Sequence, residues 1–403
     1  MVYFGVLIII IGVILFYNIF YKKELLAPNN LFTLIILSTY AIACLRFSDL
    51  KHEYNIWFLL QLVLAILCFR LGYKFKVKNY NEKFIYTYNE TKLKKIIYLL
   101  FFVVVGSFIV MWIKLGPPPA ISKVDRASYF VSGFGTLYLT IDILTFLLIY
   151  DLFDKKVMKN KSYMMLLLLI IIIISMANKF QIIYFICQYT VLYNFMKKKI
   201  NIKALIALVL LILIIFVLYY SVIYQGMYIS NDDMYMVNKM NFPERYSMLT
   251  NPYLYIAFNY ENLYYYMSCN DVQFGFGYYI LQDLLDAFEI KEILYNNCDF
   301  LTNQWKENLQ YKWLTTGTIF RELYMDFGVI GIYLGCICMG YISKISYKKG
   351  INSKSIFYVY FYASNMISIF LAFFTNNFIS INYLLNVFCT YWISKYCFSK
   401  LNK

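Results

Sequence analysis

Three charged residues at the start of a late apolar run are the most chemically informative feature of the sequence. Arg321, Glu322 and Asp326 lie at the beginning of the run 318–343. Glu322 and Asp326 are four residues apart, which places both carboxylates on one face of a helix, one turn apart. Charges at this depth are costly if they face lipid, so we expect them to face a wet interior cavity. The segment predicts a polar site at the outer boundary of a membrane; alternatively, Arg321 and Glu322 are ordinary interfacial charges.

Other residues in or beside apolar runs allow two interpretations each. Asp142 lies in the middle of the run 133–150, where a buried acid either relays protons or is a neutral, hydrogen-bonded structural residue. Lys179 separates two short apolar runs. It either extends to the membrane surface or joins a basic cluster with Arg126, Arg245 and Arg321. Small residues after Asp326 predict close packing on a neighbouring helix: Gly328, Gly331 and Gly335.

The elements that must position these residues are long apolar runs. Of the 403 residues, 62% are hydrophobic and only 15% are charged. No soluble domain tolerates this composition, so the sequence predicts an all-α polytopic membrane protein. The runs are long enough to cross about 30 Å of hydrocarbon as helices. Eleven transmembrane helices are predicted, at 2–20, 31–46, 56–73, 96–113, 133–150, 162–177, 179–196, 204–224, 318–343, 356–374 and 377–396.

The spans divide the chain into three parts. Residues 1–224 hold the first eight predicted helices, 225–316 form one large polar loop, and 317–403 hold the last three helices and a tail. Most of the 37 Lys and Arg residues fall in alternate short connections and in the tail. The positive-inside rule then places the N-terminus outside, the C-terminus in the cytoplasm and the large loop outside. Topology therefore explains the net charge of +15 better than binding to nucleic acid does.

The large loop contains two segments with a recognisable pattern. Residues 253–268 are very aromatic and too short to span, which suits an interfacial or re-entrant helix. Residues 278–295 predict one amphipathic helix with an acidic polar face, which favours packing on the protein over anchoring to lipid. Cys269 and Cys298 lie in the same loop, where they either form a disulfide or remain unpaired small hydrophobes.

A second outside connection precedes the fifth predicted span. It contains Pro117, Pro118 and Pro119 in a row, followed by Arg126. Three prolines predict a stiff extended segment that could hold Arg126 over the membrane surface. The alternative is a simple tether followed by the start of a helix.

The segment from Gly317 to Gly331 resembles the late-span signature of the Wzy-type O-antigen and capsule repeat-unit polymerases. In that family a polar start and an aromatic residue precede an Asp/Asn-Phe-Gly and a second glycine three residues later, as at 326–328 and Gly331 here. Further features resemble the family: Arg126 before the fifth span, the short hairpin at 178–179, and the Tyr- and Asn-bearing segment 253–266 in a large outside loop. The family often has arginine where Lys179 stands, which weakens a bidentate phosphate clamp at that position.

The resemblance implies a glycosyltransferase of GT-C-like architecture in the bacterial cytoplasmic membrane. It would move a growing glycan from undecaprenyl pyrophosphate onto a lipid-linked repeat unit, for lipopolysaccharide or capsule, beside a chain-length-regulating membrane protein. Outward cations would hold the pyrophosphate: Arg126, Arg245, Arg321 and Lys179. A carboxylate would act as base on the acceptor hydroxyl: Asp326 or Glu322 first, then Glu244 and Glu261. Sugars would contact Tyr253, Tyr260, Tyr264, Asn259, Asn262 and Tyr324, although the tyrosines also suit an interfacial belt.

Other functional classes fit less well. An O-antigen ligase typically uses a histidine in the large loop, and 225–316 has none. His52, the only histidine, lies in a short connection, and we do not expect it to be catalytic. A transporter or flippase of lipid-linked glycans tends to show two similar halves, and a non-catalytic membrane scaffold would not need Asp326. No Walker, GxSxG or HExxH motif is present, so no cofactor and no metal are expected.

Overall fold

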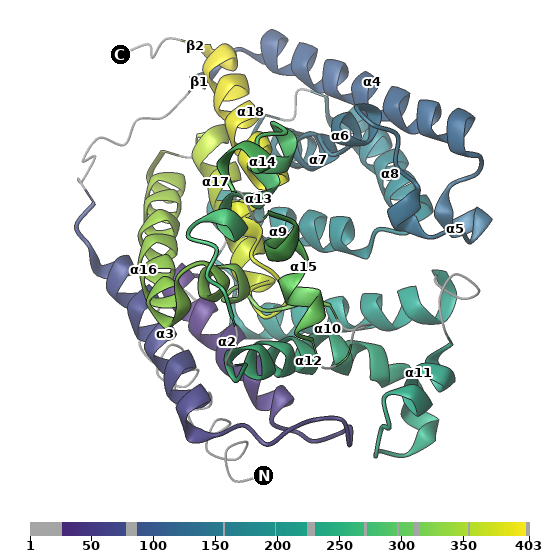
Figure 1. Cartoon of the computed structure of the whole chain (residues 1–403). Helices are drawn as coiled ribbons and strands as arrows, with labels where there is room; N and C mark the ends of the chain where they lie inside the picture. The colour runs from purple at the N-terminus through teal and green to yellow at the C-terminus, as the bar shows by residue number, and fades with distance from the viewer. Residues whose placement is uncertain are drawn as a thin grey trace.

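A computed structural model describes most of the chain: residues 26–77, 87–155, 158–197, 199–223, 230–269, 272–295, 298–309, 311, 315–353 and 355–399. The first predicted span, 2–20, lies outside these residues. The described part is helical (Figure 1). Its only sheet is a short antiparallel pair, β1 (Thr87–Tyr88) with β2 (Phe398–Ser399), in which Thr87 faces Ser399 and Tyr88 faces Phe398. This pair joins the start of α4 (Glu90–Leu115) to the end of α18 (Ile381–Cys397).

The ten predicted apolar runs that fall in the described residues all form helices. They correspond to α2 (Pro28–Ala43), α3 (Ile56–Lys74), α4 (Glu90–Leu115), α6 (Phe134–Tyr138) with α7 (Ile141–Tyr150), α8 (Lys159–Ser175), α9 (Lys179–Met196), α10 (Ile202–Leu218), α16 (Arg321–Ser353), α17 (Ile356–Phe370) and α18 (Ile381–Cys397). The connections between them add α5 (Pro119–Ser122), α11 (Asn231–Val237), α12 (Thr250–Met267), α13 (Tyr278–Ala287), α14 (Lys291–Leu294) and α15 (Cys298–Glu307). Short 3-10 turns are η1 (Arg126–Ser128), η4 (Glu244–Leu249) and η5 (Asn377–Ile379), and π-helical turns are η2 (Asp151–Lys155) and η3 (Tyr219–Ile223).

Several of the long helices begin at a side chain that caps their free N–H groups. Asn55 Oδ1 accepts the Phe58 N–H at 2.9 Å at the start of α3, and Asn89 does the same for Lys92 at 3.0 Å in α4. Ser380 caps α18 through the Tyr383 N–H at 3.3 Å. Asn and Ser are favoured at this position because their oxygens satisfy amides that have no partner in the helix.

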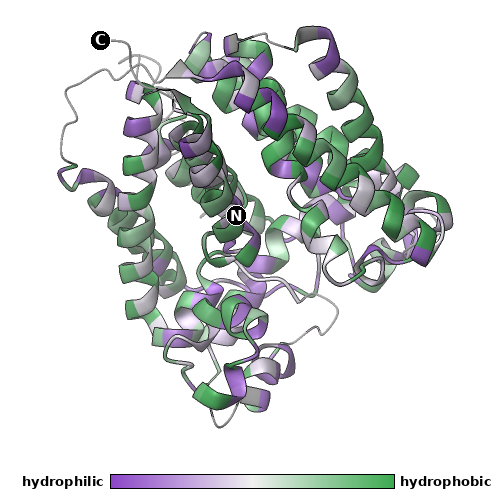
Figure 2. Cartoon of the chain, turned by 90° about the horizontal axis from the view of Figure 1, so that it is seen from above, coloured by the Kyte–Doolittle hydropathy of each residue, from purple (hydrophilic) through white to green (hydrophobic). Residues whose placement is uncertain are grey.

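Five helical segments in the described chain are long and apolar enough to cross a membrane: Ile56–Lys74, Glu90–Ser122, Phe134–Asp154, Lys203–Ile223 and Arg321–Ser353. Helices α2, α8 and α17 are apolar but shorter. Hydrophobic residues dominate the long helices, and hydrophilic residues gather at their ends and in the connections (Figure 2). Large apolar side chains such as Phe102 and Ile113 in α4 remain exposed on the outer surface of the bundle. This pattern is compatible with a membrane protein.

The late glycines have a different role from the predicted one. Helix α16 is interrupted at Phe327–Gly328, where Gly328 has a φ of 60° that L-residues rarely adopt. A Cβ on Gly331 would lie 2.1 Å from the Leu323 carbonyl oxygen, so this glycine packs inside the kink rather than on a neighbouring helix. The close helix–helix contact comes from Gly72 and Gly340, where α3 and α16 cross. Their absent side chains let the two backbones touch.

The structure bears on two expectations for the large loop. The aromatic segment is helix α12, and its aromatic face packs within the protein: Leu254, Ala257, Phe258 and Tyr260 are all buried, mainly against α2. Whether this helix is interfacial or re-entrant stays a prediction. The amphipathic segment is not one helix, because it breaks after α13 at Glu289, which has a φ of 54°, before α14 begins. The side chain of Cys298 lies outside the described part of the structure. The prediction of a disulfide between Cys269 and Cys298 therefore stays a prediction.

Candidate functional site

A cavity of about 290 Å³ lies between α7, α9, α17 and the start of α18, beside the η1 and η5 turns. Amide side chains line it: Asn178, Gln181, Gln188, Asn377, Asn382 and Asn386. Hydroxyl groups also line it: Ser364, Ser368, Thr375 and Ser380. Aromatic rings complete the wall: Phe180, Tyr184, Tyr360, Phe374 and Tyr383. Hydrogen-bonding groups mixed with aromatic faces suit a polyhydroxylated ligand such as a sugar.

One cation and one carboxylate belong to this cavity. Arg126 is half-buried in the η1 turn, and its Nη1 donates to Asn178 Oδ1 at 2.8 Å. Asp142 is 9% exposed and lies in the first turn of α7. The predicted fifth span is broken between α6 and α7 at Leu139, which also lines the cavity. Irregular backbone is tolerated at membrane depth only where it is covered by protein or borders a cavity.

The wall of the cavity is held by hydrogen bonds between α7 and α9. Gln188 Nε2 donates to the Asp142 backbone oxygen at 2.8 Å, and Thr145 donates to Gln188 Oε1 at 3.0 Å. A further bond comes from α6, where Tyr138 donates to Gln181 Oε1 at 2.9 Å. By contrast, Gln181 Nε2 and Asn377 Nδ2 are buried donors without a hydrogen-bond partner in the described protein. Since buried polar groups are nearly always satisfied, these two donors point to a ligand that the cavity accepts.

Lys179 lies behind the cavity wall rather than in it. It is 1% exposed, and its Nζ lies 3.8 Å from the centroid of the Tyr255 ring and 4.4 Å from that of Tyr220. The rings of Phe216 and Phe180 lie slightly farther away. These aromatic faces stabilise the ammonium through cation–π interactions. Its chain neighbours 178 and 180 line the cavity, so Lys179 anchors this corner of the site.

The other predicted cations do not join Arg126. Arg321 Nε donates to Glu322 Oε1 at 2.7 Å, and its guanidinium lies 5.4 Å from the centroid of the Trp305 ring. Arg245 is exposed in η4 and lies over its neighbour Tyr246. Glu244, in the same turn, is also exposed. The predicted single basic cluster is therefore divided among three separate places.

Asp326 holds a helix instead of facing open space. It is fully buried, and its two carboxylate oxygens accept the backbone N–H groups of Tyr279 at 3.0 Å and Ile280 at 2.8 Å. These are free amides in the first turn of α13, so Asp326 caps that helix from α16. The far side of α13 reaches the start of α18, where Asp283 accepts the Ile381 N–H at 3.1 Å. Asp326 thus fixes α13 next to the cavity.

We expect Asp326→Asn to loosen α13 by about 1–2 kcal/mol, because the amide offers only one acceptor to the two N–H groups. Faster hydrogen exchange at Tyr279 and Ile280, measured by mass spectrometry, would show it. Glu322→Gln serves as the control, since Glu322 makes no contact with α13 amides. Unchanged exchange in the Asn variant, combined with loss of activity, would contradict the capping role and favour a chemical one.

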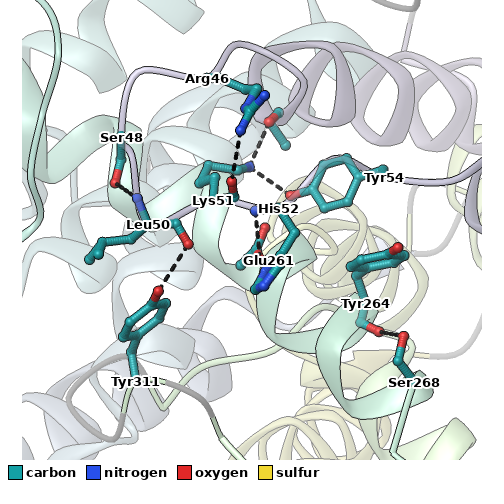
Figure 3. A network of polar contacts seen from close by, with 11 residues as sticks. Arg46, Ser48, Leu50, Lys51, His52, Tyr54, Glu261, Tyr264, Ser268 and Tyr311 are labelled. Atoms are coloured by element: carbon teal, nitrogen blue, oxygen red, sulfur yellow. Dashed lines mark hydrogen bonds and ion pairs between the residues drawn. The ribbon is translucent and has the colours of Figure 1, made fainter.

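Glu261 forms a third polar centre, with a residue that sequence analysis set aside (Figure 3). Glu261 is 1% exposed on α12, and its Oε1 accepts the His52 N–H at 3.1 Å and lies 2.5 Å from His52 Nδ1. His52 is half-exposed in the connection between α2 and α3. Neighbouring Lys51 is buried and donates to the Ala43 carbonyl and the Tyr54 hydroxyl, both at 2.6 Å. This connection is therefore fastened to α12.

Burial lowers the pKa of Lys51 from 10.5 to about 8, against the opposing attraction of Glu261. The unfolded chain then binds more protons than the folded chain between about pH 8 and 10.5, so this lysine costs stability below pH 8 and progressively less above it. We expect the stability of the wild type, relative to Lys51→Met, to rise across that window by up to about 3 kcal/mol. Thermal unfolding in detergent at successive pH values measures the difference. A pH-independent difference would contradict the burial of the ammonium.

The predicted sugar-binding residues support the protein interior instead of lining the cavity. Tyr253 donates to the Leu45 carbonyl, and Tyr260 hydrogen-bonds Thr39 at 2.8 Å. Both rings are buried. The remaining residues hold nearby segments: Asn259 and Asn262 bind Thr316, Tyr264 packs on Tyr54 and Phe58, and Tyr324 packs on Tyr266 and Phe274.

Sequence analysis missed most of the cavity. The missed residues are the amides, hydroxyls and rings of α9, α17 and α18. One available signal was the presence of polar residues inside apolar runs, such as Gln181, Gln188, Ser364, Ser368 and Asn386. In the described residues, no three His, Cys, Asp or Glu side chains are grouped so that they could hold a metal ion.

Comparison with known proteins adds no family assignment. No protein-family model matches the chain, and no curated protein and no solved structure matches it.

Proposed function

We propose that this chain is a polysaccharide repeat-unit polymerase: a membrane glycosyltransferase that moves a growing glycan from undecaprenyl pyrophosphate onto the next lipid-linked repeat unit. The observation that carries the proposal is the cavity that contains Arg126. It combines a guanidinium with amide and hydroxyl groups and with aromatic rings. A lipid-linked sugar pyrophosphate presents the matching groups, which are a dianionic linker and a polyhydroxylated ring with apolar faces.

Arg126 would act on the leaving group. A guanidinium offers planar N–H donors that match phosphate oxygens and neutralises the charge that develops as the glycosidic C–O bond breaks. The hydrogen bond from Arg126 to Asn178 orients one edge of the guanidinium group, and the 3-10 turn η1 holds the Arg126 backbone. Donors such as Gln181 Nε2 and Asn377 Nδ2 are available for sugar oxygens.

The proposed membrane topology agrees with this placement. The charge pattern puts the connections 114–132 and 371–380 on the outer face, together with the start of α9. Arg126, Asn178 and Asn377 come from these three places, so the cavity would open toward the outer side of a cytoplasmic membrane. That is the side on which a lipid-linked oligosaccharide is extended. A membrane partner that regulates chain length would be compatible with the same arrangement.

The test is chain extension by purified protein in liposomes with its lipid-linked repeat unit. The proposal predicts a ladder of products that differ by one repeat unit, with release of the lipid pyrophosphate. Movement of the intact unit across the bilayer without a ladder would instead show a flippase. Transfer of one finished glycan to a lipid A-type acceptor, without extension, would show a ligase. Either of these results would overturn the proposal.

A further inference from the structure

We infer that Asp142 is the catalytic base that takes the proton from the acceptor sugar hydroxyl. This inference deepens the proposed function and depends on it. A sugar hydroxyl is too weakly acidic to attack unaided, so glycosyl transfer benefits from a carboxylate within hydrogen-bond reach of it. Asp142 lines the same cavity as Arg126, so a single bound sugar pyrophosphate can meet both groups.

The carboxylates that the sequence analysis favoured are occupied or lie elsewhere. Both oxygens of Asp326 accept amides of α13. Glu322 is paired with Arg321 and Glu261 with His52, each through Oε1. The second oxygen of each carboxylate is buried without a hydrogen-bond partner in the described residues, but neither residue lines the cavity. Glu244 is exposed on a surface turn. None of these four side chains lines the cavity with Arg126.

Asp142 differs from them in having a free carboxylate aimed at the cavity. Its side chain makes no hydrogen bond and no ion pair with the residues that the structure describes, although only 9% of the residue's surface is exposed. Its backbone is held firmly, because Gln188 Nε2 donates to the Asp142 carbonyl oxygen. Tyr184 and Tyr360 line the cavity around it. A carboxylate that borders a cavity and has no protein partner there is available to a ligand hydroxyl.

The position of Asp142 at a helix start also suits a base. It lies in the first turn of α7, where the helix dipole favours negative charge. The N–H groups of Asp142 and Ile143 donate to the carbonyls of Leu139 and Thr140, so only the dipole contributes here. An anionic carboxylate is needed to accept a proton. The turn at Leu139 and Thr140 separates α6 from α7 and makes Asp142 the second residue of α7.

The reaction balances with these two residues. The acceptor oxygen forms a bond to the anomeric carbon of the donor glycan, and the bond from that carbon to the pyrophosphate oxygen breaks. The electron pair leaves with the pyrophosphate, whose charge Arg126 stabilises. The hydroxyl proton passes to the Asp142 carboxylate and then to solvent. No oxidant, reductant or nucleotide is consumed.

The test compares Asp142→Asn with Asp142→Glu in the liposome extension assay, with Glu244→Gln as a matched control. Loss of a positioned base typically costs about 10²–10⁴-fold in rate. We expect a loss of that size in the Asn variant and measurable extension in the Glu variant, which keeps a carboxylate. We expect no change in the control, because Glu244 is exposed and away from the cavity. Thermal stabilisation by the lipid-linked unit should persist in the Asn variant.

Three results separate this inference from the proposed function. If the wild type extends chains and the Asn variant binds the unit but does not extend it, Asp142 is the base. If the Asn variant extends chains as fast as the wild type, the assignment of Asp142 as the base is overturned while the polymerase proposal stands. If the wild type makes no ladder, the polymerase proposal fails and the base assignment fails with it. Should the Asn variant not fold, equal activity of folded Asp142→Ser and wild type would overturn the inference in the same way.

Discussion

Replacing Arg126 by alanine should slow chain extension by roughly 10²–10³-fold, the range seen when one preorganised donor to a developing negative charge is removed. Arg126 is the only one of the four predicted phosphate-binding cations that lines the described cavity. The alanine variant also loses the hydrogen bond from Arg126 Nη1 to Asn178 Oδ1, which is 2.8 Å long in the wild type. Rates of extension from the liposome assay, at saturating lipid-linked unit, measure the effect.

Two matched variants define what Arg126 does. Arg126→Lys keeps the charge but loses the planar fork, so we expect an intermediate rate. Arg245→Ala removes an exposed arginine from the large loop and should leave the rate unchanged. A loss of rate in Arg245→Ala as large as in Arg126→Ala would mean that general outer-surface charge matters, rather than the cavity.

Gly340→Ala should destabilise the fold by about 1–3 kcal/mol or more. A Cβ at this position would lie 2.1 Å from the Phe69 carbonyl oxygen, and that oxygen belongs to the backbone of α3 and cannot rotate away. Gly72 presents the same problem on the other helix, where a Cβ would lie 2.0 Å from the Ile337 carbonyl oxygen. The two helices must therefore separate to admit a methyl group.

Thermal unfolding of the purified protein in detergent tests this expectation. Gly106→Ala is the control, because Gly106 in α4 has no atom within 4 Å of an added Cβ. Replacing that glycine should be neutral or slightly stabilising, since alanine favours helix. Equal melting temperatures for wild type and Gly340→Ala would contradict the close crossing of α3 and α16.

The helices could be predicted from the sequence because their signals are local. Apolar length and capping residues such as Asn55, Asn89 and Ser380 lie within the segment that they define, and each predicted run in the described residues is helical. The break between α6 and α7 was missed, because an apolar run that contains one acid still resembles a continuous helix. The bounds of the spans relative to a membrane remain predictions.

The site was harder to predict because it depends on contacts between distant segments. The sequence predicts a role for Arg126, but its hydrogen-bond partner Asn178 lies 52 positions away and no local pattern connects the two. Asp326 is an acid within an apolar run, yet its oxygens accept two amides of α13 that lie 46 and 47 positions earlier in the chain. His52 was set aside, and it contacts Glu261 across 209 positions. Sequence spacing carries information about one helix face, but not about which helices meet.

A lipid-linked sugar pyrophosphate is proposed to bind in the cavity that contains Arg126 and Asp142. The most direct measurement places a photo-reactive phenylalanine analogue at Asn382, an exposed residue that lines this cavity, and at Tyr246, which is exposed on the large loop. Each protein is irradiated with a radiolabelled lipid-linked repeat unit. Binding in the cavity predicts strong labelling from position 382, competed by the unlabelled lipid-linked unit, and only background labelling from position 246. Background labelling at position 382 with competed labelling at position 246 would contradict it.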